Sequence, residues 1–232
     1  MIREKFYLET ELVASEDIQN TYEIKRTWGT EGRKGLVLEL YPTLSMDRCG
    51  ELDLSTMYLM NHVKDFKWCS VRIVNLYSKV FGCKPHASQL ETDETNIAYI
   101  EEILDGEDIY EYDIVIATGR SLSTHKKTIE AKLDILHILQ EKKLEGQVKC
   151  IIPEFVDVNA SQGIHPLFLG LHHAKEQWYL EAYDIPHAIA ELEDYLKERE
   201  VKKSVLIDSI DKTEKKVKKE KKKDVLQNQE ST

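Results

Sequence analysis

Residues 36–63 read "LVLELYPTLSMDRCGELDLSTMYLMNHV", a buried strand that runs through a polar loop into a helix. The strand is almost wholly apolar, and the helix, expected at 52–65, carries Leu, Met and Val at its buried positions. The loop between them holds a proline, several hydroxyl groups and two acids, Asp47 and Asp53. A strand that leads directly into such a loop indicates a ligand site, because open α/β sheets bind ligands beyond the carboxyl ends of their strands.

Strands and helices alternate along the chain from residue 36 to about 153. Further strands are expected at 70–78, 112–119 and 147–153, and helices at 94–104, from Ser121 or Ser123 to Gly146, and at 185–200. This alternation is typical of α/β proteins, so we predict a three-layer sandwich with a mainly parallel core sheet of four strands. Residues 21–41 are predicted to form an N-terminal antiparallel hairpin at the sheet edge, because two alternating segments flank the turn "GTEGRKG".

Charge is unevenly distributed along the 232 residues, whose net charge is −10. Residues 202–232 hold ten Lys and six Asp or Glu, a balance of +4, so residues 1–201 carry the difference, −14. We predict one α/β domain over 1–201 and a disordered Lys-rich tail over 202–232, because so charged a segment cannot bury a core. The acidic domain disfavours duplex nucleic acid, which binds through cationic contacts. The tail leaves RNA or an acidic protein open as a partner.

Composition argues against several classes of protein. No apolar run approaches the roughly 18 residues of a membrane helix, and the opening "MIREKFYLETEL" lacks the apolar region of a signal peptide, so we expect a cytoplasmic protein. The four cysteines form no C-x-x-C pair, and the adjacent His172 and His173 cannot share a helical face, so we expect no metal and no other cofactor. The glycine motifs of P-loop and dinucleotide-binding proteins are absent, as is the G-x-S-x-G of serine hydrolases.

Candidate site residues follow each predicted core strand at its carboxyl end. They are Tyr41, Pro42, Thr43, Asp53, Ser55, Asn75, Gly119, Arg120, His165 and Pro166. Because parallel strands end at one edge of the sheet, we expect these residues to form a single small-molecule site. Asp53 is predicted to be an acceptor or general base, Asn75 to orient the ligand, and His165, as an imidazole that titrates near neutral pH, to act as an acid or to stabilise negative charge. Arg120 offers a forked donor for an anion at a helix N-terminus.

Five motifs of the chain resemble, in order, those of a bacterial and phage family known as domain of unknown function 1643. They are Tyr41-Pro42-Thr43, Asp53-Leu54-Ser55, Val74-Asn75-Leu76, Thr118-Gly119 and His165-Pro166-Leu167-Phe168-Leu169. Tyr41 stands where the family has Asn, and Thr118 stands where it has Trp. The resemblance covers roughly residues 21–170 and brings no known activity. It implies one constellation made of Asp53, Asn75, Gly119 and His165.

The predicted architecture is also similar to that of the uracil-DNA glycosylase superfamily, in which a Pro-containing loop faces the base and a His-Pro loop faces the sugar and phosphate. This similarity implies a ligand that is a nucleobase, nucleoside or nucleotide, and cleavage of a base–sugar bond is one version of the hypothesis. A ligand-sensing or protein-interaction module with a degraded site is an alternative, indicated by Tyr41 and Thr118. Nucleic-acid binding through the Lys-rich tail is another. The sequence does not indicate the oligomeric state.

Overall fold

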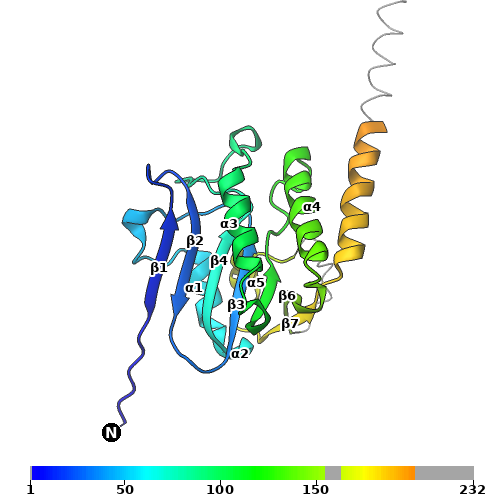
Figure 1. Ribbon diagram of the computed structural model, residues 1–232. Coiled ribbons are helices and arrows are strands. Elements are labelled where there is room, and N and C mark those ends of the chain that lie inside the picture. The colour runs from blue at the N-terminus through cyan, green and yellow to red at the C-terminus, as the bar shows by residue number, and fades with distance from the viewer. Residues whose placement is uncertain (1, 155–162, 202–232) are drawn as a thin grey trace, which may run out of the picture. The chain divides into compact units, whose positions relative to one another are not determined.

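The computed structural model, which describes residues 2–154 and 163–201, is an α/β protein built on a mixed sheet (Figure 1). Within the described residues the sheet has seven strands in the order β1-β2-β4-β3-β5-β6-β7. The strands are β1 (Glu9–Ala14), β2 (Thr21–Thr27), β3 (Arg33–Glu39), β4 (Trp68–Asn75), β5 (Tyr112–Ile116), β6 (Val148–Pro153) and β7 (Trp178–Ala182). The helices are α1 (Leu54–Asn61), α2 (Val63–Phe66), α3 (Glu94–Leu104), α4 (Lys126–Glu141), α5 (Pro166–His173) and a last helix over 185–201. The predicted α/β class is confirmed.

Two compact units divide the chain, Met1–Ile189 and Ala190–Thr232. The sheet and all residues of the candidate site belong to the first unit. The predicted Lys-rich tail, 202–232, lies outside the described residues, and the predicted end of the domain at residue 201 stays a prediction. None of the described helices combines the length and the apolar character that a bilayer crossing requires.

Strand β3 lies at the centre of the sheet, parallel to β4 on one side and to β5 on the other. Strand β5 is in turn parallel to β6. Antiparallel strands flank this region at both edges, with β2 and β1 beyond β4, and β7 beyond β6. The sheet is therefore larger than predicted and mixed, because two strands that the sequence did not indicate, β1 and β7, extend it.

The predicted hairpin over residues 21–41 is wrong. Its two strands, β2 and β3, do not pair, because β4 lies between them, antiparallel to β2 and parallel to β3. The antiparallel edge consists instead of β1 and β2, paired from Glu9 opposite Thr27 to Ala14 opposite Thr21. Gly32, with φ of +126°, still lies in the connection between β2 and β3. This connection leads to the second strand along the sheet rather than to the strand next to β2.

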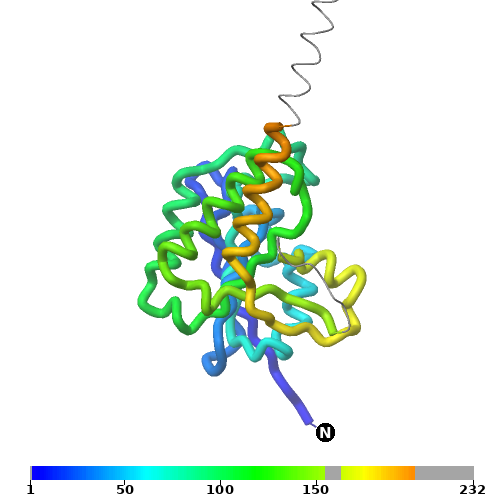
Figure 2. Tube along the Cα trace, turned by 90° about the vertical axis from the view of Figure 1, so that its right-hand side faces the viewer, coloured from blue at the N-terminus to red at the C-terminus, as the bar shows by residue number. Residues whose placement is uncertain are grey.

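Helices cover both faces of the sheet. Figure 2 shows α3 and α4 on one side, and α1, α2 and α5 on the other. The core on the α1 and α5 side takes residues from five strands, β3 to β7, and from the three helices of this face, among them Val37, Ile73, Val115, Leu59 and Leu169. Side chains alternate along a strand, so the residue two positions after each of these strand residues faces the same side.

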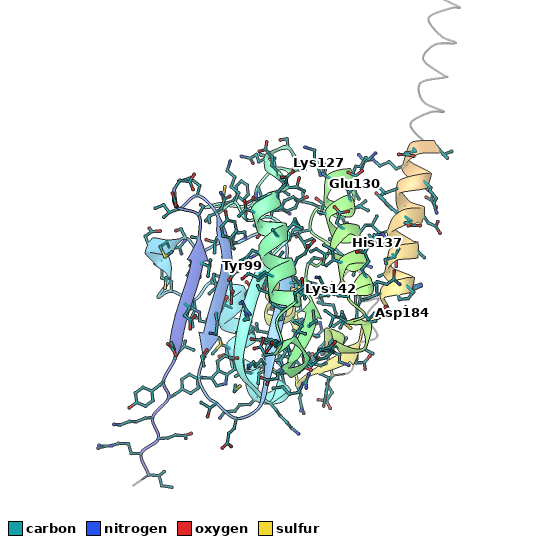
Figure 3. All side chains as sticks on the ribbon, in the orientation of Figure 1. Tyr99, Lys127, Glu130, His137, Lys142 and Asp184 are labelled. Atoms are coloured by element: carbon teal, nitrogen blue, oxygen red, sulfur yellow. The ribbon has the colours of Figure 1, made fainter. Side chains whose placement is uncertain are left out.

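A charged network holds α3 to the opposite face. Tyr99 of α3 lies over β2 in Figure 3, and its hydroxyl donates to the Glu23 carboxylate. Glu23 also accepts two hydrogen bonds of 2.7 Å from the Arg72 guanidinium. Outward-facing polar residues of α4, such as Lys127 and Glu130, complete the exposed surface of this side (Figure 3).

Two predicted helices differ from the structure. The helix predicted at 52–65 begins only after its N-cap Asp53 and is divided at His62, whose backbone is not helical, into α1 (Leu54–Asn61) and α2 (Val63–Phe66). Helix α4 begins at Lys126 with His125 as its N-cap, so neither Ser121 nor Ser123 caps it. It ends at Glu141 rather than near Gly146. Helix α3 has the predicted bounds, 94–104, and its N-cap Asp93 accepts a hydrogen bond of 3.0 Å from the Thr95 amide.

Candidate functional site

A cavity of about 660 Å³ lies at the carboxyl edge of the sheet. Its walls come from the end of β3, the loop that follows, the start of α1, the loop at 81–84 and the start of α5. The chain leaves β3 toward the α1 face and leaves β5 toward the α4 face (Figure 2). The cavity therefore lies beside a topological switch point, the usual place for a ligand in an open α/β sheet.

Half of the residues predicted from the sequence line this cavity. They are Tyr41, Thr43, Asp53, Ser55 and His165. The others, Pro42, Asn75, Gly119, Arg120 and Pro166, are not part of its lining. Pro42, Asn75, Gly119 and Pro166 are buried, whereas Arg120 is exposed.

Glu39, at the end of β3, is the central residue of the cavity that the sequence reasoning missed. It is only 5% exposed, and its Oε1 has no hydrogen-bond partner among the described residues. Burial and, to a smaller extent, the nearby charge of Asp53 raise the pKa of Glu39 to about 8, against the opposing effect of the hydrogen bond with Ser55. Glu39 is therefore protonated at neutral pH. The feature of the sequence that could have identified Glu39 is the presence of an acid inside the apolar run "LVLELY".

Asp53 is the N-cap of α1 and is held in the opposite protonation state. Its Oδ1 accepts hydrogen bonds from the Thr56 amide at 2.7 Å and the Ser55 hydroxyl at 3.1 Å. Its Oδ2 accepts one from the Thr43 hydroxyl. Burial alone would raise the pKa of Asp53, but these hydrogen bonds outweigh burial and lower it. Asp53 therefore presents a carboxylate to the cavity.

His165 is the N-cap of α5, and its backbone is extended, with φ of −70° and ψ of 134°, because the proline that follows it disfavours the helical region. Its Nδ1 accepts a hydrogen bond of 3.2 Å from the Leu167 amide, so in the neutral ring the proton is on Nε2. Burial lowers the pKa of His165 to about 4, although the charge of Asp53 raises it. The expectation that this imidazole titrates near neutral pH is therefore wrong, because burial of most of the ring, whose side chain is 27% exposed, penalises its charged form.

Glu39 and His165 face each other across the floor of the cavity. Glu39 Oε2 lies 3.7 Å from His165 Nε2, which is longer than a hydrogen bond. At this distance neither group satisfies the other, so the carboxyl O–H of Glu39 and the Nε2–H of His165 are both left as donors. Both can donate to an acceptor atom of a ligand, while the Asp53 carboxylate can accept from it.

Gly119 packs closely against His165, and Lys132 holds Gly119 in place. Gly119 has φ of +63°, and a Cβ placed on it would lie 2.9 Å from the Cβ of His165. The Gly119 carbonyl accepts a hydrogen bond of 2.8 Å from Lys132 Nζ, and burial lowers the pKa of Lys132 to about 8. Helix α4 thus fixes the loop on which His165 rests. The sequence offered a signal for Lys132, which interrupts the apolar stripe containing Ile129 and Leu133.

Asn75 lies next to Glu39 in the sheet, because the two residues are partners in the parallel β3–β4 register. It is 2% exposed, and its Oδ1 has no hydrogen-bond partner among the described residues. Its backbone carbonyl accepts a hydrogen bond of 2.8 Å from the Asn96 side chain. Asn75 is therefore a buried neighbour of the site, which the structure brings beside Glu39 but not to the cavity wall.

The cavity rim is aromatic and cationic. Tyr41 and Phe81 meet edge to face with ring centroids 6.2 Å apart, and Phe168 contributes a third ring. The cations at the rim are Arg48 and Lys84 rather than Arg120. Arg48 Nη2 lies 2.7 Å from the Glu51 carboxylate. In the described part of the chain, no group of three or more His, Cys, Asp or Glu side chains could hold a metal ion.

A protein-family model described as "Protein of unknown function (DUF1643)" matches residues 21–167. This range includes the cavity residues from Tyr41 to His165. No curated protein and no solved structure matches the chain significantly. The architectural similarity to the uracil-DNA glycosylase superfamily therefore finds no support among solved structures.

Proposed function

The chain belongs to the DUF1643 family, and because that description names no activity, we propose from the site that the protein is an acid–base enzyme acting on a small nucleoside or nucleotide. The observation that carries the proposal is the pair of carboxyl groups in one cavity, Glu39 protonated and Asp53 ionised. Two titratable groups whose surroundings drive their pKa values apart are typical of an acid and its ionised counterpart in one active site.

The cavity suits a ligand of this size and kind. Its volume, about 660 Å³, lies within the range of small-molecule sites. The rings of Tyr41, Phe81 and Phe168 can pack on a planar base, and the donors Glu39 and His165 can bind its ring nitrogens or carbonyl oxygens. Lys84 and Arg48 at the rim can hold a phosphate.

The reaction that fits these groups is hydrolysis of the bond between base and sugar. Glu39 would give its proton to the leaving nitrogen of the base as the bond to the sugar breaks. The Asp53 carboxylate would stabilise the positive charge that develops on the sugar ring and accept a hydrogen bond from the attacking water. The water oxygen bonds to the sugar carbon, and its released proton replaces the one that Glu39 has given up. The lowered pKa of Asp53 makes it a weak base, so electrostatic stabilisation suits it better than proton abstraction.

The test is release of free base from a panel of nucleosides and nucleoside phosphates, followed by chromatography. Glu39→Gln keeps the side-chain shape and removes the acid, so we expect turnover to fall about 10²- to 10⁴-fold. Asp53→Asn is the second test variant, because it removes the carboxylate charge. Asp93→Asn is its matched control, because Asp93 also caps a helix, α3, but does not line the cavity. Full turnover in Glu39→Gln would exclude the proposed reaction.

A ligand-sensing module is the second candidate, favoured by Tyr41 and Thr118, which stand where the resembled family has Asn and Trp. It predicts that a nucleoside or nucleotide binds and that no base is released. Binding lost in Asp53→Asn but unaccompanied by product would support this function over the enzyme.

A further inference from the structure

Strand β1 forms an edge of the sheet whose outer side pairs with no strand in the described part of the chain. Residues 2–8 continue from it as an extended arm that leaves the sheet (Figure 1). The arm carries large apolar side chains in water, with Ile2 99%, Phe6 66% and Tyr7 72% exposed. An open strand edge that continues into an apolar arm is a template for pairing with another strand.

The arm and β1 have two distinct faces. Even-numbered residues of β1 are half-buried and odd-numbered residues are exposed. Continuing this alternation into the arm places four apolar residues, Ile2, Phe6, Leu8 and Leu12, on the face that is half-buried in β1, together with Glu4 and Thr10. The exposed face carries two bases followed by two acids, namely Arg3, Lys5, Glu9 and Glu11.

This order of charges is complementary to itself when two copies run antiparallel. A two-fold axis normal to the sheet places the same face of both strands on the same side of the joined sheet. Two residues that lie opposite each other, one from each copy, must therefore have numbers that add up to an even number. With Tyr7 opposite Tyr7 of a second copy, the sum is 14, and Lys5 faces Glu9 while Arg3 faces Glu11. Phe6 then faces Leu8 on the other side of the sheet. Shifting the register by two residues in either direction breaks one of the two charge pairs.

We propose that residues 2–12 pair antiparallel with the same residues of a second copy of this chain, centred on Tyr7. Residues 2–5 of each copy would extend the outer edge of the other copy's β1, joining the two sheets into one. Each dimer would contain two Lys5–Glu9 pairs and two Arg3–Glu11 pairs between copies. Glu11 would then lie between Arg3 of the second copy and Lys25 of its own β2, whose Nζ lies 3.1 Å away.

The first test is a charge exchange in the full chain, with the dimer dissociation constant measured by analytical ultracentrifugation. Lys5→Glu places like charges opposite each other twice in the dimer, so the dissociation constant should rise about tenfold. Adding Glu9→Lys restores opposite charges at the same positions and should restore the dimer. Lys127→Glu, on the outer face of α4, makes the same charge change away from the edge and should have no effect.

The second test fixes the register by oxidative cross-linking. The thiol introduced by Tyr7→Cys faces its own copy across the axis and should form a disulfide-linked dimer. The thiol introduced by Arg3→Cys faces Glu11 and should not, and both variants retain the four native cysteines. A wild-type chain that stays monomeric at all micromolar concentrations would overturn the proposal. A dimer whose dissociation constant does not change in Lys5→Glu would also overturn it. Equal cross-linking of both cysteine variants would do the same, because it would show that the two copies meet through other contacts.

Discussion

Glu39 and Asp53 carry the same functional group and line the same cavity, yet they hold their protons differently. Asp53 sits at a helix N-terminus and accepts hydrogen bonds from two hydroxyls and one amide. Glu39 sits at the end of a central strand, with one oxygen unpartnered and the charge of Asp53 nearby. Local surroundings, rather than residue type, therefore assign the acid and the carboxylate.

Glu39 should make the stability of the fold depend on pH. Its pKa is 4.5 when unperturbed and about 8 when buried, so the folded state binds more protons than the unfolded state between these values. The free energy of unfolding therefore falls as pH rises through this window. His165, with a pKa lowered from 6.5 to about 4, contributes the opposite slope only below pH 6.5. Lys132, with a pKa lowered to about 8, adds an opposite slope toward the upper end of the range from pH 6.5 to 8, so the Glu39 effect there is isolated by comparison with a variant that keeps His165 and Lys132.

As the pH rises from 6.5 to 8, the free energy of unfolding of Glu39→Gln should increase by about 2 kcal/mol relative to that of the parent chain. Urea unfolding at several pH values measures this difference. Glu130→Gln, an exposed position on α4, is the control and should follow the parent at every pH. Parallel curves for Glu39→Gln and the parent would show that Glu39 is ionised in the folded state.

Gly119→Ala should destabilise the fold by about 2 kcal/mol, because its φ of +63° is unfavourable for alanine and the new methyl group would press on His165. Gly146→Ala is the control, since a Cβ there meets nothing within 4 Å. Thermal unfolding of both variants gives the comparison. Equal stability of the two variants would show that the loop under His165 can move without cost.

The sequence revealed the residues of the site that stand at strand ends and in motifs, such as Asp53 and His165. It did not reveal Glu39 or Lys132, which lie inside apolar segments. In such segments a charged residue usually marks the solvent side of a strand or helix, and only the packed structure shows that both side chains are buried. Arg120 lies in the expected loop, but it is exposed and does not line the cavity, and the N-cap of α4 is His125 rather than Ser121 or Ser123.

At the scale of elements, the site depends on the contact between α1 and α5. The Tyr58 ring of α1 rests on Gly170 of α5, where a Cβ would lie only 1.9 Å from Cγ of the ring. This contact allows the two helices to approach closely, and their first turns bring Asp53 and His165 to one cavity. Gly170 is therefore needed for packing, although its backbone angles are ordinary for a helix.

Gly170→Ala should cost about 1–3 kcal/mol, because the methyl group forces the ring or the helix to shift. Removing the ring should remove this cost, so Gly170→Ala should be nearly neutral in a Tyr58→Ala background. Unfolding free energies of the two single variants and the double variant give the coupling between the residues. Additive effects would mean that the helices do not meet at this contact.

Elements with strong periodicity or long apolar runs were predicted well, as the bounds of α3 show. Strands β1 and β7 were missed because each lies at a sheet edge and carries exposed polar residues, as in "ETELVA" and "WYLEA". Helix α5 was missed because "PLFLGLHH" is short and apolar on most sides, so it has no clear helical period. The false hairpin shows a different limit: local patterns predict strands, but not which strands become neighbours.

At the scale of the whole molecule, the cavity joins segments that are far apart in the sequence. Glu39 comes from the central strand, Asp53 from the helix after it, and His165 from beyond the last parallel strand. A ligand that contacts all three links these segments of the sheet unit. Binding should therefore stabilise this unit as one cooperative body rather than a single loop.

A nucleoside or nucleotide at 100 times its dissociation constant should add about 2.7 kcal/mol to the free energy of unfolding. For a chain of this size the melting temperature should rise by about 5–10 °C. Hydrogen exchange should slow most around residues 41–55 and at the start of α5, which hold most of the cavity lining. Asp53→Asn should abolish the rise, whereas Asp93→Asn should preserve it. A rise of equal size in both variants would place the ligand elsewhere on the protein.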